Sequence, residues 1–175
     1  MIYLTIDKVP STPYFEILDV RRPILPPIED VTEQIGGRHG LIDFGQKIGA
    51  RIIEVDIMLH STSIEEFRKQ VDRVASFIFS SEVRELQFSD EPNIIYYARL
   101  TGETNLEQLV SWGTTTLTFV CFDPYKYDAE ETIYSKTEVC NNDLIPIENL
   151  SDSTLFPEIT ITNVGQPIEN LCPNP

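Results

Sequence analysis

The sequence predicts an α+β fold: a mainly antiparallel, β-sandwich or barrel-like domain with one amphipathic helix packed on its sheet. Several stretches alternate apolar and polar residues with the two-residue period of a strand. One stretch repeats apolar residues with the period of a helix. Strands on both sides of a single helix are typical of such domains. The 175 residues are 41% hydrophobic and 23% charged, enough for one sizeable core.

Four stretches are expected to be strands. The clearest alternates Ile53, Val55, Ile57 and Leu59 with mostly polar residues, which gives one apolar face. The others lie at residues 2–6, 95–101 and 114–122, where β-branched and aromatic residues are frequent. Glycines indicate turns between these stretches, at Gly36, Gly37, Gly40, Gly45, Gly49, Gly102 and Gly113.

The helix is expected over residues 64–79. Ser63 precedes it and Glu66 follows three residues later, the spacing of a capping box. Its apolar stripe is predicted to face the sheet, with these residues buried: Phe67, Val71, Val74 and Ile78.

Prolines and charge mark the ends of the predicted domain. Residues 22–27 contain three prolines, which exclude a helix or a central strand. This run is either an extended arm that contacts another molecule or a surface loop that closes back on its own domain. Acidic residues dominate after residue 122, with 10 acidic and 2 basic groups. We therefore expect one domain over 1–128, and over 129–175 a linker with the beginning of a second domain.

Composition excludes several classes of protein. A net charge of −15 argues against specific nucleic-acid binding, which needs basic residues to displace phosphate counterions. No apolar run approaches the length of a membrane span, and residues 1–10 do not resemble a signal peptide. Three scattered cysteines do not form a disulfide scaffold. The expectation is a soluble, reduced protein made inside a cell, with no membrane partner.

No catalytic, cofactor-binding or metal-binding residues are predicted. The two histidines are expected in structural places, His39 in a Gly-rich turn and His60 at a strand end. No sequence pattern for a zinc, calcium, phosphate or dinucleotide site occurs. The acidic clusters at 90–91 and 128–131 are expected to be solvated loops. Of the cysteines, Cys121 is expected in the core, and pairing of Cys140 with Cys172 is not expected.

The order of several motifs resembles a known family. The proline run at 22–27 is followed by the Gly-rich turn at 36–40, Asp43-Phe44-Gly45 and the stretch from Arg51 to Ile57. After the helix come 86–92, 96–102 and the closing run from Leu117 to Tyr127. Over residues 1–128 this pattern is similar to the distal tail proteins of siphophages that infect Gram-positive bacteria. Residues 156–163 resemble the opening of that family's galectin-like C-terminal β-sandwich.

The resemblance implies a structural, non-enzymatic protein at the virion tail tip, made in the bacterial host cytoplasm. Such proteins form a hexameric hub ring. The implied partners are other copies of the chain, the tail tube protein, the tail-associated protein, and receptor-binding or other baseplate proteins.

Two other functions are weighed against this one. A carbohydrate-binding or adhesion module for the host cell wall would need aromatic residues grouped in the C-terminal part. Beyond residue 128 the only aromatic residues in the sequence are Tyr134 and Phe156, too few to form a sugar-binding surface. A cell-wall hydrolase would need a catalytic carboxylate pair, which 28 acidic residues supply by chance.

Overall fold

The computed structural model contains two units, Met1–Glu131 and Thr132–Pro175. It describes residues 2–37, 39–109, 112–135, 144, 146–149 and 158–162. Every helix and strand in this described part belongs to the first unit. That residues 129–175 begin a second domain stays a prediction, and Cys140, Cys172 and Phe156 lie outside the described residues.

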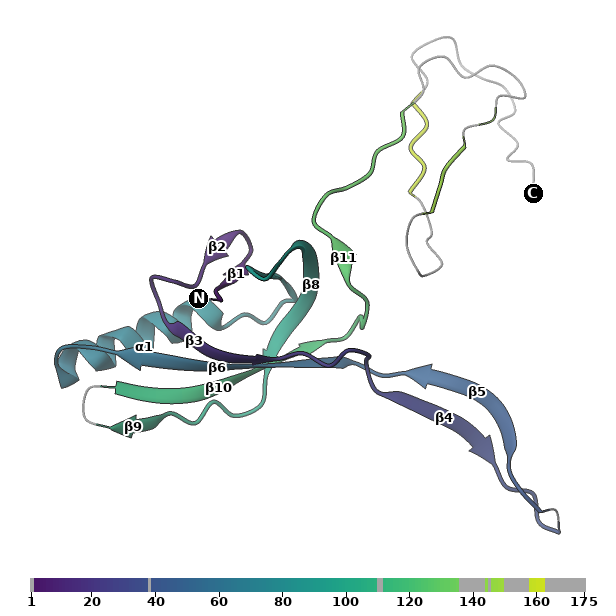
Figure 1. Ribbon diagram of the computed structural model, residues 1–175, viewed down its shortest axis with the longest axis horizontal. Coiled ribbons are helices and arrows are strands. Elements are labelled where there is room, and N and C mark those ends of the chain that lie inside the picture. The colour runs from purple at the N-terminus through teal and green to yellow at the C-terminus, as the bar shows by residue number, and fades with distance from the viewer. Residues whose placement is uncertain are drawn as a thin grey trace. The chain divides into compact units, whose positions relative to one another are not determined.

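The first unit is an antiparallel sheet with one helix, which confirms the predicted α+β class (Figure 1). Nine strands form the sheet, in the order β2-β1-β7-β8-β10-β6-β3, with β11 beside β8 and β9 beside β10. Their bounds are β1 Leu4–Ile6, β2 Val9–Pro10, β3 Glu16–Arg21, β6 Arg51–His60, β7 Arg84–Phe88, β8 Glu91–Thr101, β9 Glu107–Leu109, β10 Trp112–Cys121 and β11 Tyr127–Asp128. The four predicted strand stretches correspond to β1, β6, β8 and β10.

Strand β8 joins the two halves of the sheet. Tyr96 and Ala98 pair with β7, whereas Arg99, Leu100 and Thr101 pair with β10. Buried side chains from both halves belong to one core, for example Leu4 and Phe88 from one half and Val55 and Phe119 from the other. The fold is therefore sandwich-like, with apolar faces of a single sheet packed on each other.

Two glycines predicted in turns lie inside strands instead. Gly45 is in β5 (Ile42–Ile48), where the register to its partner strand shifts, and its φ of 96° is the left-handed conformation that glycine accepts at a bulge. Gly113 is the second residue of β10. A Cβ there would lie 2.9 Å from the Glu107 carbonyl and 3.1 Å from Phe67, so the close approach of helix and strand requires glycine.

The helix α1 covers Ile64–Ile78, one residue shorter than predicted. The Ser63 side chain accepts a hydrogen bond from the Glu66 amide, as predicted, but the Glu66 carboxylate accepts from the Thr62 hydroxyl. Phe67, Val74 and Ile78 are buried, whereas Val71 is only partly buried. The prediction missed Phe77, which is buried and stacks on Tyr14 with ring centroids 4.1 Å apart. The last apolar residue of the stripe, Phe79, is the C-cap and is exposed.

We expect Phe67→Ala to lower the free energy of unfolding by roughly 3–5 kcal/mol, because the ring is fully buried against Gly113. Urea unfolding followed by circular dichroism measures this loss. Ile64→Ala is the control on the same helix, since Ile64 is 57% exposed, and it should cost less than about 1 kcal/mol. Equal losses in the two variants would contradict the burial of this helix face.

Candidate interface at the arm and its root

Residues 28–48 form an arm whose two strands, in the described part of the chain, pair with each other and with no further strand. Strands β4 (Ile28–Glu33) and β5 (Ile42–Ile48) make a two-stranded sheet separate from the nine-stranded one. Figure 1 shows this hairpin extending from the body beyond β3 and β6. The proline run at 22–27 was expected to be either the arm or a closing loop. It is the root that connects β3 to the arm.

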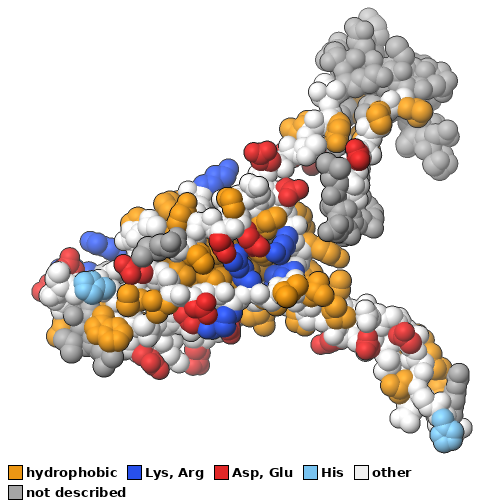
Figure 2. Space-filling view, in the orientation of Figure 1, with side chains coloured by type: hydrophobic (Ala, Val, Ile, Leu, Met, Phe, Trp, Pro, Cys, Tyr) orange, Lys and Arg blue, Asp and Glu red, His pale blue; other side chains and the backbone are white. Residues whose placement is uncertain are grey.

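The arm exposes apolar side chains that no neighbouring strand covers. Ile28 and Ile48 face each other across the two strands and are each about half exposed. Phe44 is 61% exposed. Figure 2 shows hydrophobic and acidic side chains together along the arm. An isolated two-stranded hairpin with an uncovered apolar surface is marginally stable in water, so this surface is suited to a protein contact.

A buried arginine holds the root in place. Arg51, only 4% exposed, donates from Nη1 to the Pro23 carbonyl (2.6 Å) and from Nε to the Pro124 carbonyl (3.0 Å). The other end of the root is closed by the Gly49 amide, which donates to the Pro27 carbonyl at 2.8 Å. Both ends of the root are therefore hydrogen-bonded before the arm begins.

An ionic cluster, which we call the root cluster, also holds the root: Arg22, Asp90, Glu91, Tyr96 and Lys126. Arg22 pairs with Asp90 and with Glu91 (2.8 Å). Glu91 also accepts from the Tyr96 hydroxyl (2.7 Å) and from Lys126 Nζ (3.2 Å). Figure 2 shows acidic and basic side chains gathered on the body near the start of the arm. Asp90 lies in an exposed turn, as the expectation of a solvated loop at 90–91 had it, but Glu91 is the first residue of β8, and both carboxylates bind cations from distant parts of the sequence.

The root cluster keeps Glu91 ionised. Burial alone raises the pKa of this carboxyl, but the hydrogen bonds from Tyr96 and Lys126 and the charges of Arg22 and Lys126 outweigh burial and lower the pKa below its ordinary value. Burial and the hydrogen bond to Glu91 raise the pKa of Tyr96. Glu91 therefore stays an acceptor and Tyr96 a donor at neutral pH.

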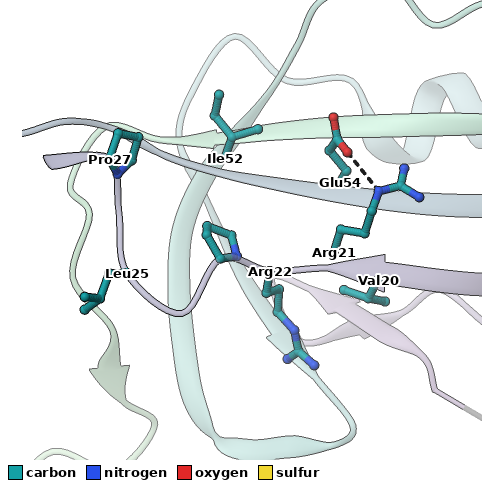
Figure 3. A pocket seen from close by; sticks show the side chains of 8 residues that line it. Val20, Arg21, Arg22, Leu25, Pro27, Ile52 and Glu54 are labelled. Atoms are coloured by element: carbon teal, nitrogen blue, oxygen red, sulfur yellow. Dashed lines mark hydrogen bonds and ion pairs between the residues drawn. The ribbon is translucent and has the colours of Figure 1, made fainter.

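A shallow groove of about 690 Å³ lies beside the root (Figure 3). Strand β3, which is an edge strand of the sheet, supplies Val20 and Arg21. Arg21 lies between Glu54 (2.9 Å) and Asp56 (2.6 Å). Leu25 of the root and Ile52 of β6 are 64% and 48% exposed. The groove thus joins an open strand edge to apolar side chains, and both of its arginines, Arg21 and Arg22, are already in ion pairs.

The two histidines lie where the sequence predicts them. His39 is exposed in the turn of the arm, and His60 is exposed at the end of β6. His60 borders a second cavity of about 290 Å³ at the start of α1, where the buried hydroxyl of Ser61 has no hydrogen-bond partner among the described residues. Cys121 is buried as expected, and burial raises the pKa of its thiol to about 11.

Searches for metal and membrane features cover the described residues only. In this part of the chain, no three His, Cys, Asp or Glu side chains are grouped closely enough to hold a metal ion. None of its helices is both long and apolar enough to cross a membrane.

Comparisons with known proteins point to phage tails. Residues 10–121 match the family model described as the phage tail protein RIFT-related domain. The distal tail protein of Bacillus phage SPP1 is 29% identical over 140 residues, which cover 75% of this chain and 55% of that protein. The crystal structure of SPP1 Dit, described as a paradigm of the hub adsorption apparatus in phages infecting Gram-positive bacteria, superimposes with a TM-score of 0.66 at 26% identity. That match covers 73% of this chain and 52% of the SPP1 chain, so this chain spans about half the length of these relatives.

Glu91→Gln should lower the free energy of unfolding by about 1–2 kcal/mol at pH 7, because charge-assisted hydrogen bonds in a partly exposed cluster are lost. The folded pKa of Glu91 is depressed, so its stabilisation is present above the unfolded pKa of about 4.3 and is lost as the pH falls through the folded value. The difference between wild type and variant should therefore shrink toward pH 3.

Urea unfolding at pH 7 and at pH 3 measures both quantities. Glu65→Gln is the matched control, since the Glu65 side chain is 83% exposed and, among the described residues, forms an ion pair with Lys69 alone. It should change stability by less than about 0.5 kcal/mol at either pH. A Glu91→Gln deficit of the same size at both values would rule out an ionic origin.

Proposed function

This chain belongs to the siphophage distal tail protein family and is a structural component of a phage tail, and from that premise we propose that it forms a six-fold hub ring at the tail tip. The observation that carries the proposal is the arm, which exposes Phe44, Ile28 and Ile48 on a hairpin that no other strand covers. SPP1 Dit, its relative, is described as a hub. The relatives are structural tail proteins, and we propose no enzymatic activity for this chain.

The geometry of the arm suits a ring. In a closed ring each copy uses one surface to bind a different surface of the next copy, so the interface is heterologous. An arm held at its root but otherwise separate from the body can reach a neighbour without disturbing its own core. The apolar side chains of the arm would be covered in the ring. The edge of β3 and the groove beside the root offer backbone and apolar groups for a receiving surface.

The remaining partners follow from the position of such a ring. We propose that one of its sides meets the tail tube protein and the other the tail-associated protein, with receptor-binding or other baseplate proteins outside. The chain is then synthesised in the host cytoplasm and assembled into the virion tail tip. Residues 1–128 would be the ring domain, and residues 129–175 a linker with the start of a second, galectin-like domain.

We expect concentrated protein to contain a species of about six times the chain mass of 20.0 kDa. Phe44→Arg should weaken this species, because a charge would replace an apolar side chain in the contact. At least a tenfold higher concentration should be needed for the same degree of assembly, as expected for the loss of about 1.4 kcal/mol or more. Light scattering gives the mass, and negative-stain images show whether the species is a ring.

Phe79→Arg is the control, since this phenylalanine is 75% exposed at the end of α1 and does not belong to the arm. It should assemble as the wild type does. Equal weakening by both substitutions would show that the arm is not the contact, and a single-chain mass at every concentration would count against the ring.

The proposed ring must let DNA pass, so we expect no measurable affinity for duplex DNA at physiological salt. A net charge of −15 repels phosphates, whereas a basic lumen would hold them by counterion release. Fluorescence anisotropy with a labelled duplex is the measurement, repeated at low salt to expose weak binding. A dissociation constant in the low micromolar range or tighter at physiological salt would contradict the expectation.

A further inference from the structure

Two segments that are distant in sequence share the same side-chain partners. One is the arm root, residues 22–27, and the other is the exit segment, residues 123–128, by which the chain leaves the first unit. Arg51 donates to Pro23 in the root and to Pro124 in the exit segment. Glu91 binds Arg22 of the root at 2.8 Å and Lys126 of the exit segment at 3.2 Å. Two independent side chains thus bridge the same pair of segments.

Each bridge makes the two segments depend on each other. The Arg51 guanidinium is planar and buried, so its donors point in fixed directions, and displacing the Pro23 carbonyl leaves a buried donor without its partner. Arg22 and Tyr96 both bind Oε2 of Glu91, which leaves Oε1 for Lys126. Removing Arg22 leaves Tyr96 to hold Oε2, so Glu91 is fixed less firmly in the position from which it binds Lys126.

The exit segment pairs with the sheet over a short stretch, although the Tyr127 ring also packs edge-on against Tyr97 of β8. Its strand β11 has only two residues, which pair with Ile94 and Ile95 of β8. The Ala129 amide donates to the Asn93 carbonyl at 2.9 Å just beyond it. A short edge strand of this kind opens easily. The frequency of opening therefore depends on contacts made by side chains outside the strand.

We infer that the arm root and the exit segment form one conformational unit, coupled through Arg51 and Glu91. The seating of the arm on a partner and the position of the exit segment then influence each other, and this influence is reciprocal because it is a coupling free energy. The inference goes beyond the proposed ring: the coupling lies within one chain and holds whether or not the ring forms.

Hydrogen exchange of the full chain tests the coupling in both directions. Arg22→Met removes a contact of the root, and the Ala129 amide and the amides of β11 should then exchange about five-fold faster. Lys126→Met removes a contact of the exit segment, and the Gly49 amide, bonded to the Pro27 carbonyl, should speed up by a similar factor. Rates are normalised to the amides of β6 and β10 in the same variant, which separates this effect from a general loss of stability.

Arg21→Met is the matched control. Arg21 is adjacent to Arg22 and is also engaged in ion pairs, but its carboxylate partners, Asp19, Glu54 and Asp56, lie on β3 and β6 and not in the root cluster. It should leave the Ala129 and β11 amides unchanged. The inference is overturned if Arg22→Met and Lys126→Met each affect only their own segment, or if Arg21→Met accelerates the exit amides as much as Arg22→Met does.

Discussion

A buried guanidinium needs hydrogen-bond acceptors, and the way Arg51 obtains them organises one end of this molecule. Its donors reach carbonyls of two prolines, Pro23 and Pro124, which come from segments on either side of the domain's sequence. Arg51 is also the first residue of β6, the strand that lies between β3 and β10. Arg51 thus fixes two places relative to the strands of the sheet. One is Pro23, where the root of the arm begins, and the other is Pro124, in the segment that follows β10.

The root cluster adds charge to this arrangement at Arg22, the residue next to Pro23. Arg22 lies over the Phe88 ring at 4.6 Å while it pairs with Asp90 and Glu91. Partial burial costs a cation hydration free energy, and contacts with an aromatic face and two carboxylates offset most of this cost. The cluster therefore keeps the root in a defined conformation, and a defined root limits the directions in which the arm can extend. A contact arm that is ordered in advance loses less entropy on binding.

The sequence predicted the helices and strands that can be recognised from the pattern of neighbouring residues. Alternation identified β6, the frequency of β-branched and aromatic residues identified β10, and the capping residue Ser63 gave the first residue of α1. Phe77 lies three residues after Val74, so the helical period could have identified it, but its contact with Tyr14 was missed because the two residues are far apart in sequence. The root cluster was missed for the same reason, since Arg22 and Glu91 are 69 positions apart. The proline run did indicate an arm, but only strand pairing shows that the arm itself is the hairpin after it.

The position of β8 between the two halves of the sheet has a consequence for changes in chain length. A strand that pairs with β7 and then with β10 tolerates an inserted or deleted residue between Tyr96 and Thr101 poorly, because every side chain beyond that point changes face where no bulge absorbs the shift. A residue inserted between Tyr96 and Ala98 would turn one of these two side chains out of the core. Residues 34–41 at the tip of the arm carry no such restriction, since a longer turn leaves the pairing of β4 with β5 intact. Insertions and deletions among descendants of this sequence should therefore collect at the tip of the arm and avoid β8.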